Sequence, residues 1–149
     1  MKIVSIKKEL LDAYREIDKE VLDKHGRPCV LFVRLKYKGK NRMFAVPFRS
    51  NIPGNVPKTQ YFPLPPRSTT KRGHRHGIHY IKMFPVAKCY LERYRLDNPA
   101  AQLCYAIVNR NEKRIIKECQ NYLSMYENGN VSPYSTSLDR LIEKLGQMI

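Results

Sequence analysis

Three histidines lie within six residues of one another, at His74, His76 and His79, and Lys82 follows them. An imidazole can take up and release a proton near neutral pH, and lysine and arginine bind phosphate oxygens. The pattern therefore predicts proton transfer beside a phosphate-bearing ligand. The alternative is a solvated basic loop that binds the ligand without catalysis. The cations that flank the histidines are Lys71, Arg72 and Arg75.

A second group of polar residues, Arg49-Ser50-Asn51, follows a stretch with the character of a β-strand. An arginine and a serine at a strand end can hold a phosphate through charge and hydroxyl donors. Serine and asparagine are also common in turns for local hydrogen-bonding reasons, so the tripeptide by itself is weak evidence.

Acidic residues are absent from the middle of the chain. No Asp or Glu occurs from Lys24 to Leu91, whereas this stretch holds 15 of the 28 Lys and Arg residues and all four histidines. The whole chain carries a net charge of +15. This segregation predicts a polyanionic partner, nucleic acid first and an acidic membrane surface second. It also argues against a magnesium-dependent site there, because hard cations need carboxylate ligands.

The elements expected from periodicity and turn residues define an α+β chain, with a small antiparallel sheet and packed helices. Strands are expected at residues 1–5, 29–37, 42–48 and 78–84, with a turn at 38–41. Pro47 suggests a strand end or an edge strand. The proline-rich stretch 49–77 is expected to be one long irregular loop with a basic tip at 67–77.

Helices are expected at residues 7–24, capped by Ser5, and from the Asn98-Pro99 start signal onward. The second pattern fits one long helix or two helices broken near residues 109–111, and Gly129 ends it. Ser137 is expected to cap a last helix. The 149 residues fit a single domain spanning residues 1–149.

The four cysteines, at positions 29, 89, 104 and 119, lack metal-ligand spacing and are expected to be reduced thiols, mostly buried. No segment resembles a secretory signal or a membrane span, so we expect a cytoplasmic protein that needs no cofactor.

RNA is a polyanion that can be cut without a metal. Its 2′-hydroxyl attacks the adjacent phosphorus and leaves a 2′,3′-cyclic phosphate, provided that groups are present to move protons and stabilise charge. Metal-independent RNA cleavage is therefore one hypothesis, and a basic RNA-binding protein without catalysis is the alternative. The residues expected to contact RNA are Arg34, Lys36, Asn51, Lys71, Arg72, His74, Arg75 and His76.

Three segments resemble the toxins of type III toxin–antitoxin systems, the family of ToxN, AbiQ, CptN and TenpN, with the TenpN branch most similar. They are residues 44–52, the proline-rich stretch to Pro66, and residues 77–86. The resemblance implies a barrel-like antiparallel sheet with helices, as in the Kid and MazF toxins. It also implies metal-independent endoribonuclease activity, inhibition by a pseudoknotted repeat antitoxin RNA that the toxin processes, and a role in phage defence.

The resemblance also implies site residues. Ser50 falls where the family places an active-site serine after its second hairpin strand. Arg49 stands where the ToxN branch has threonine, and the lysine that follows the serine in that branch is absent. Lys82 is the candidate to replace that cation, and His79 is a further candidate catalytic residue at a position where an acidic residue is expected in relatives.

Overall fold

The apolar run that begins at Cys29 forms strand β2 (Cys29–Tyr37), which is buried on both faces at its start. Val30 and Phe32 belong to one hydrophobic core, and Cys29 and Leu31 belong to a second. Successive side chains of a strand point to opposite faces, so a strand between two cores must be apolar at every position. This is why residues 29–32 read as a continuous apolar run.

The computed structural model describes all 149 residues and contains a seven-stranded antiparallel sheet, which is not closed into a barrel. The strands follow the order β4-β5-β3-β2-β1-β7, and the short β6 pairs with β3. The remaining strands are β1 (Lys2–Ile6), β3 (Lys40–Pro53), β4 (Tyr61–Leu64), β5 (His74–His79), β6 (Phe84–Pro85) and β7 (Leu91–Arg93). The expected α+β class is confirmed.

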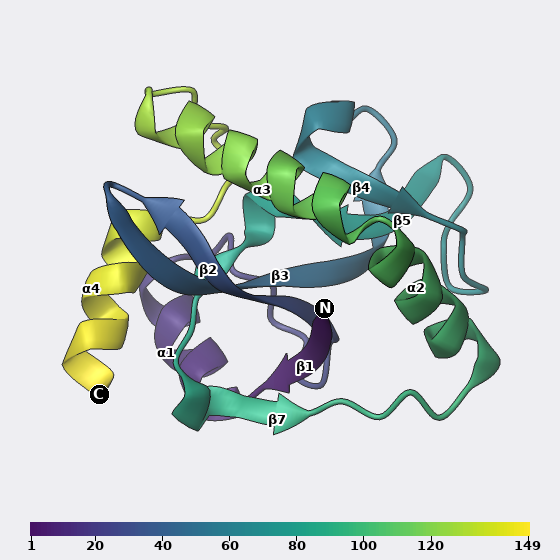
Figure 1. The fold of residues 1–149 in the computed structure, drawn as a ribbon, viewed down its shortest axis with the longest axis horizontal. Coiled ribbons are helices and arrows are strands. Elements are labelled where there is room, and N and C mark those ends of the chain that lie inside the picture. Colours follow the sequence, from purple (N-terminus) through teal and green to yellow (C-terminus); the bar gives the residue numbers. More distant parts are fainter.

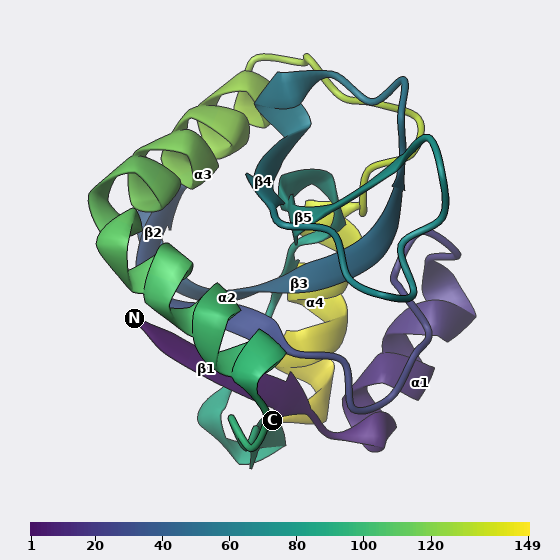
Figure 2. The same ribbon diagram turned by 90° about the vertical axis from the view of Figure 1, so that its right-hand side faces the viewer.

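Two pairs of helices cover the two faces of the sheet (Figures 1 and 2). Helices α2 (Pro99–Arg110) and α3 (Glu112–Glu127) pack on one face, where Val108, Ile115 and Leu123 enter the first core. Helices α1 (Lys8–Ile17) and α4 (Leu138–Met148) pack on the other face. No helix has the length and apolar character needed to cross a membrane.

Helix boundaries follow local signals only where a side chain supplies a cap. Asn98 accepts a hydrogen bond from the Ala101 amide at 2.8 Å and begins α2 as expected. The chain bends at Asn111, so the broken form of the expected helix is the one observed. Ser137 occupies the N-cap position of α4, but its side chain makes no cap hydrogen bond.

The expected helix over 7–24 is wrong in its second half, and Ser5 lies in β1 and caps nothing. Helix α1 ends at Ile17 because Asp18 is extended and buried, and its carboxylate accepts hydrogen bonds from the Glu20 and Ser137 amides at 2.9 and 2.7 Å. This tertiary contact with the start of α4 stops the helix. The segment 18–28 therefore connects α1 to β2 without helical structure.

The expected irregular loop over 49–77 is also wrong in its extent. Strand β3 runs through Pro47 to Pro53, and the segment that follows forms a 3-10 turn (Lys58–Gln60), strand β4 and the start of β5. Pro47 is tolerated in the middle of β3 because it pairs with Cys29, the first residue of β2, while pairing with β5 begins one residue later at Phe48. The expected strand 78–84 is instead the end of β5, a 3-10 turn (Tyr80–Lys82) and β6.

All four cysteines are free thiols. Cys29 and Cys119 are buried as expected, whereas Cys104 is half-buried and Cys89 is exposed.

Candidate active site

Strand β3 divides the expected site residues between its two sides. Ser50 lines a pocket together with Phe48 and His76, whereas Arg49 lines a different pocket together with His79. Successive residues of a strand point to opposite faces, and this alternation separates Arg49 from Ser50. We name the two cavities the Ser50 pocket and the His79 pocket.

The Ser50 pocket encloses about 210 Å³, and no Asp or Glu is among the residues that line it. Its walls come from the segment after α1, from β3 and β5, from the β4–β5 loop and from the residue that follows β7. Figure 2 shows that loop and the segment after α1 on the same side of the molecule. The lining residues are Lys24, His25, Gly26, Arg27, Pro28, Phe48, Ser50, Arg67, His76 and Tyr94. One lining residue has a carboxylate partner, because His25 Nε2 lies 3.2 Å from Glu92 Oε1.

Arg27 is the most constrained cation of the Ser50 pocket. Its Nη1 donates to the carbonyl oxygen of Phe48 at 2.9 Å, and its buried Nε has no partner. Burial lowers the pKa of Arg27, and the charge of Arg49 adds to this effect, whereas Cys29 and Asp23 act in the opposite direction. A guanidinium that has an unpaired donor and lies near a second cation is suited to bind an anion. The anion would accept a hydrogen bond from the donor and reduce the repulsion between the two cations.

His76 is buried, with 3% of its surface exposed, so it is not an exposed part of the basic loop, and its expected contact with RNA stays a prediction. Its Nδ1 lies 2.8 Å from the Pro65 carbonyl oxygen, which can only accept, so Nδ1 carries the proton. In the neutral ring Nε2 then holds a lone pair. Burial lowers the pKa of His76, so the ring is neutral at pH 7 and Nε2 can accept a proton.

The His79 pocket brings together three of the four expected catalytic residues. Arg49, His79 and Lys82 line it with Glu20, and Arg49 Nη1 lies 3.4 Å from His79 Nδ1. Burial, followed by the charges of Arg49, Lys82 and Arg27, lowers the pKa of His79 to about 3. His79 is therefore neutral at physiological pH.

Lys82 lies in a 3-10 turn, is 5% exposed, and lines the His79 pocket, not the Ser50 pocket. Lys82 and Ser50 therefore line different pockets, and the catalytic role expected for Lys82 stays a prediction. Its Nζ donates to Glu20 Oε1 at 2.9 Å and to the Tyr134 carbonyl oxygen at 2.7 Å. These contacts join the segment after α1 to the α3–α4 connection, so the structure gives Lys82 a clear architectural role.

The basic tip of the β4–β5 loop is exposed at Lys71, Arg72 and Arg75, and His74 beside it is half-buried. Asn51 fixes this tip, because its Nδ2 donates to the Thr69 carbonyl at 3.1 Å and its Oδ1 accepts from the Lys71 amide at 2.7 Å. Its side-chain amide therefore positions the cations of the loop.

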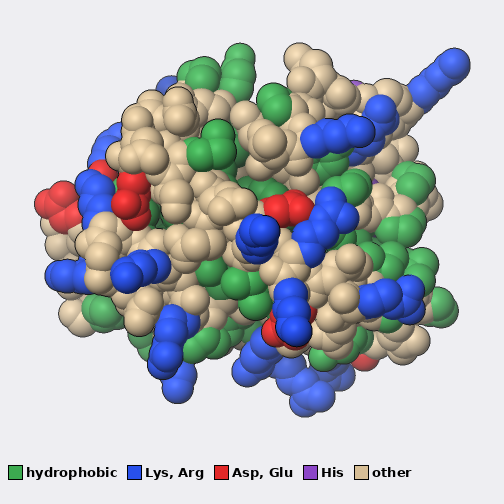
Figure 3. Space-filling view, turned by 45° about the horizontal axis from the view of Figure 1, so that its top comes forward, with side chains coloured by type: hydrophobic (Ala, Val, Ile, Leu, Met, Phe, Trp, Pro, Cys, Tyr) green, Lys and Arg blue, Asp and Glu red, His purple; other side chains and the backbone are tan.

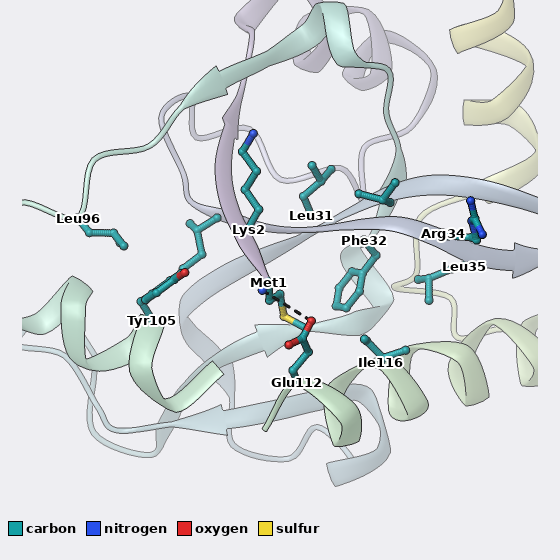
Figure 4. A pocket seen from close by; sticks show the side chains of 12 residues that line it. Met1, Lys2, Leu31, Phe32, Arg34, Leu35, Leu96, Tyr105, Glu112 and Ile116 are labelled. Atoms are coloured by element: carbon teal, nitrogen blue, oxygen red, sulfur yellow. Dashed lines mark ion pairs between the residues drawn. The ribbon is translucent and has the colours of Figure 1, made fainter. Parts of the chain in front are cut away.

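Arg34 and Lys36 are exposed on β2, and the Lys36 backbone exchanges two hydrogen bonds with the Gln120 side chain. Arg34 lies at a larger pocket of about 760 Å³, shown in Figure 4. That pocket is lined mainly by apolar residues, and Glu112 pairs with the Met1 ammonium inside it at 3.6 Å. Its size exceeds that of the Ser50 pocket, but no histidine and no serine line it.

The sequence reasoning did not include several residues of the Ser50 pocket. Four basic groups and one tyrosine were missed, namely Lys24, His25, Arg27, Arg67 and Tyr94. The first three open the carboxylate-free stretch, and this was the signal that could have found them. Lys and Arg side chains are also spread across the face in Figure 3, where Asp and Glu are few.

Three solved structures share this fold over nearly their whole length. The first is from a bacterial antiviral system regulated by a processed non-coding RNA, with a TM-score of 0.76, 17% identity, and 97% of this chain and 96% of that chain covered. The second is from a bacterial type III toxin–antitoxin system in which a non-coding RNA pseudoknot selectively inhibits the toxin, with a TM-score of 0.72, 19% identity and coverage of 99% and 96%. The third is AbiQ, a lactococcal anti-phage endoribonuclease of a type III system, with a TM-score of 0.73, 13% identity and coverage of 99% and 96%.

These similarities show that the chain has the fold of type III toxin–antitoxin proteins. No family model and no curated protein sequence matches it.

Proposed function

We propose that this protein is a metal-independent endoribonuclease toxin of a type III toxin–antitoxin system, of the TenpN branch. The observation that carries the proposal is the Ser50 pocket, which combines a hydroxyl, a neutral histidine and several cations without a lining carboxylate. The fold supports it, because AbiQ, which shares that fold, is an endoribonuclease.

The proposed reaction is attack of an RNA 2′-hydroxyl on the adjacent phosphorus. His76 Nε2 accepts the 2′-hydroxyl proton, and the 5′-oxygen leaves with a proton from the rim, where Lys24 and His25 lie. Ser50, Arg27 and Arg67 donate hydrogen bonds to the phosphate oxygens as negative charge develops there. The products are a 2′,3′-cyclic phosphate and a 5′-hydroxyl.

The proposed partners are a repeat antitoxin RNA with a pseudoknot, which inhibits the toxin and is processed by it, and cellular or phage RNA as the substrate. Non-coding RNA regulates or inhibits two of the proteins with this fold, and AbiQ acts against phage. A processing role fits an enzyme whose inhibitor is itself RNA.

Cleavage should persist after complete chelation of divalent metal ions. The pocket offers no lining carboxylate to hold a hard cation, so we expect an unchanged rate in excess EDTA. The measurement is the appearance of fragments from total RNA, with the cyclic phosphate end identified by mass spectrometry. Loss of cleavage in EDTA and its return on adding Mg²⁺ would contradict the proposed chemistry.

RNA affinity should fall steeply with salt concentration, because many phosphates are neutralised. Replacing Lys71, Arg72 and Arg75 by alanine should weaken binding and flatten the dependence of log K on log salt by about two to three units. Alanine at three exposed lysines near α1, Lys7, Lys8 and Lys19, is the matched control and should change the slope less. Equal slopes for the loop variant and the parent would show that the loop does not contact RNA.

RNA binding without cleavage is the second candidate function, and one observation favours it. Burial lowers the pKa of both His76 and His79, so neither ring is an imidazolium at neutral pH in the free protein, and proton donation depends on the exposed Lys24 and His25 alone. The chelation experiment separates the two functions, because a binding protein yields no fragments with or without EDTA.

A further inference from the structure

One residue that lines the His79 pocket has a polar side-chain atom without a hydrogen-bond partner, and the proposed cleavage reaction does not use it. His79 is 1% exposed, and its buried Nε2 has no hydrogen-bond partner. A buried polar atom without a partner is costly in free energy and is a feature that needs an explanation. The pocket volume of about 530 Å³ is of the size that holds small ligands.

Arg49 determines what kind of ligand His79 can bind. The Arg49 guanidinium carries only donors, so its Nη1 donates to His79 Nδ1 across 3.4 Å. A neutral histidine with an accepting Nδ1 has its proton on Nε2. The orphan atom is therefore a donor, and it requires an acceptor from a ligand.

The other charges of the pocket leave it net positive. Glu20 is the only lining carboxylate, and its Oε1 accepts from Lys82 Nζ at 2.9 Å. Arg49 has no carboxylate partner within ion-pair distance, and Arg27 and Lys82 add positive charge close enough to act on His79. An anionic acceptor fits this arrangement, and a phosphate offers oxygens to both Arg49 and His79.

Other residues that line the His79 pocket can contact the base of a nucleotide. Tyr134 is 67% exposed, and an exposed aromatic ring is a stacking surface for a base. Asn55 and Gln60 bring amide groups, which can hydrogen-bond to base edges, to the same cavity.

The geometry points to a second ligand site: the His79 pocket binds one nucleotide, with its phosphate held by Arg49 and His79 and its base against Tyr134. This inference rests on the proposed function only for the source of the nucleotide, which is RNA. Ser50 lies on the other side of β3, so a bound RNA would be held by nucleotides on both sides of this strand. Arg27 lines the Ser50 pocket, and its positive charge acts on Arg49 and His79 in the other pocket.

The test is a long-range ¹H–¹⁵N spectrum of the histidine side chains, recorded on full-length Ser50→Ala protein. Without ligand, His79 should show the Nε2–H tautomer, whereas His76 should show the Nδ1–H tautomer as an internal control. The four nucleoside 5′-monophosphates are then titrated in, followed by inorganic phosphate and adenosine. We expect at least one nucleotide to shift the His79 resonances, and phosphate at higher concentration to do the same.

Variants separate the two halves of the site. Arg49→Gln should weaken nucleotide binding by about tenfold to a hundredfold, because a hydrogen bond to a charged group is lost, and Arg49→Lys should weaken it less. Tyr134→Ala should weaken binding of the nucleotide but not of inorganic phosphate. The dispersion of the amide spectrum shows whether each variant is folded.

Some outcomes overturn the inference whether or not the protein cleaves RNA. The nucleotide site is wrong if no monophosphate shifts His79, if only His76 responds, or if adenosine binds as tightly as its monophosphate. Because the assay measures binding in protein without Ser50, loss of RNA cleavage and loss of this site are read out separately.

Discussion

Ser50→Ala is expected to lower the RNA cleavage rate by about a hundredfold or more, the usual cost of removing one donor that acts on the charge of a transition state. The Ser50 hydroxyl lines the same pocket as Arg27, Arg67 and His76, where the phosphate is proposed to react. A donor used mainly in the transition state adds little to ground-state binding. Affinity for the antitoxin RNA should therefore stay close to that of the parent.

Two measurements on the same variant check this expectation. Single-turnover cleavage of a defined RNA gives the rate, and a gel shift with the repeat RNA gives the affinity. Ser68→Ala, at an exposed position of the β4–β5 loop, is the matched control and should behave as the parent in both. If Ser50→Ala cleaves RNA at the parental rate, Ser50 is only a structural residue and the reaction must be sought in the His79 pocket.

Lys82→Met is expected to destabilise the protein by about 3 kcal/mol, because removing one partner of a buried ion pair leaves the other partner uncompensated. The Lys82 side chain is 6% exposed and bridges the Glu20 carboxylate and the Tyr134 carbonyl. The Glu20 side chain is 35% exposed and can regain water, so the low end of the usual range applies. Urea unfolding followed by circular dichroism measures the loss.

A double-mutant cycle tests the ion pair itself. Glu20→Gln alone should also destabilise the protein, because it leaves the buried Lys82 ammonium without its counter-charge, and the double variant should be more stable than the sum of the two single losses predicts. Lys88→Met, at an exposed lysine, is the control and should leave the unfolding midpoint nearly unchanged. A Lys82→Met protein that is as stable as the parent but inactive would reverse the interpretation and place Lys82 in the catalytic machinery.

The Lys82 contacts stabilise the protein and also hold part of the wall of the His79 pocket. The pair fixes the segment that contains Tyr134, and the Thr136 amide donates to the Ile81 carbonyl at 3.0 Å beside it. Loss of Lys82 should therefore disturb nucleotide binding at His79 as a secondary effect. Stability has to be measured before any loss of activity in Lys82 variants is assigned to chemistry.

The sequence by itself determined the features that depend on local composition and period. The apolar residues from Cys29 onward predicted a strand, the turn at 38–41 predicted the hairpin, and Asn98-Pro99 predicted the start of a helix. The carboxylate-free stretch from Lys24 to Leu91 predicted a basic region for a polyanion, and both cationic pockets draw most of their residues from it. The strand, turn and helix-start signals depend on neighbouring residues only, and the charge signal depends on composition alone.

Only the tertiary structure decided how the site residues are grouped. Neighbours in the sequence, Arg49 and Ser50, face opposite sides of β3, whereas Arg27, Arg67 and His76 meet around one pocket. Strand alternation could have predicted the first separation, but nothing local predicts which distant segments cover each face. Likewise, Lys82 finds Glu20 62 residues away, and Asp18 ends α1 through a contact with Ser137 119 residues away. Burial and long-range pairing arise only when the helices pack on the two faces of the sheet. Burial then lowers the pKa of His76 and of His79, so that both rings are neutral hydrogen-bonding groups and not surface cations.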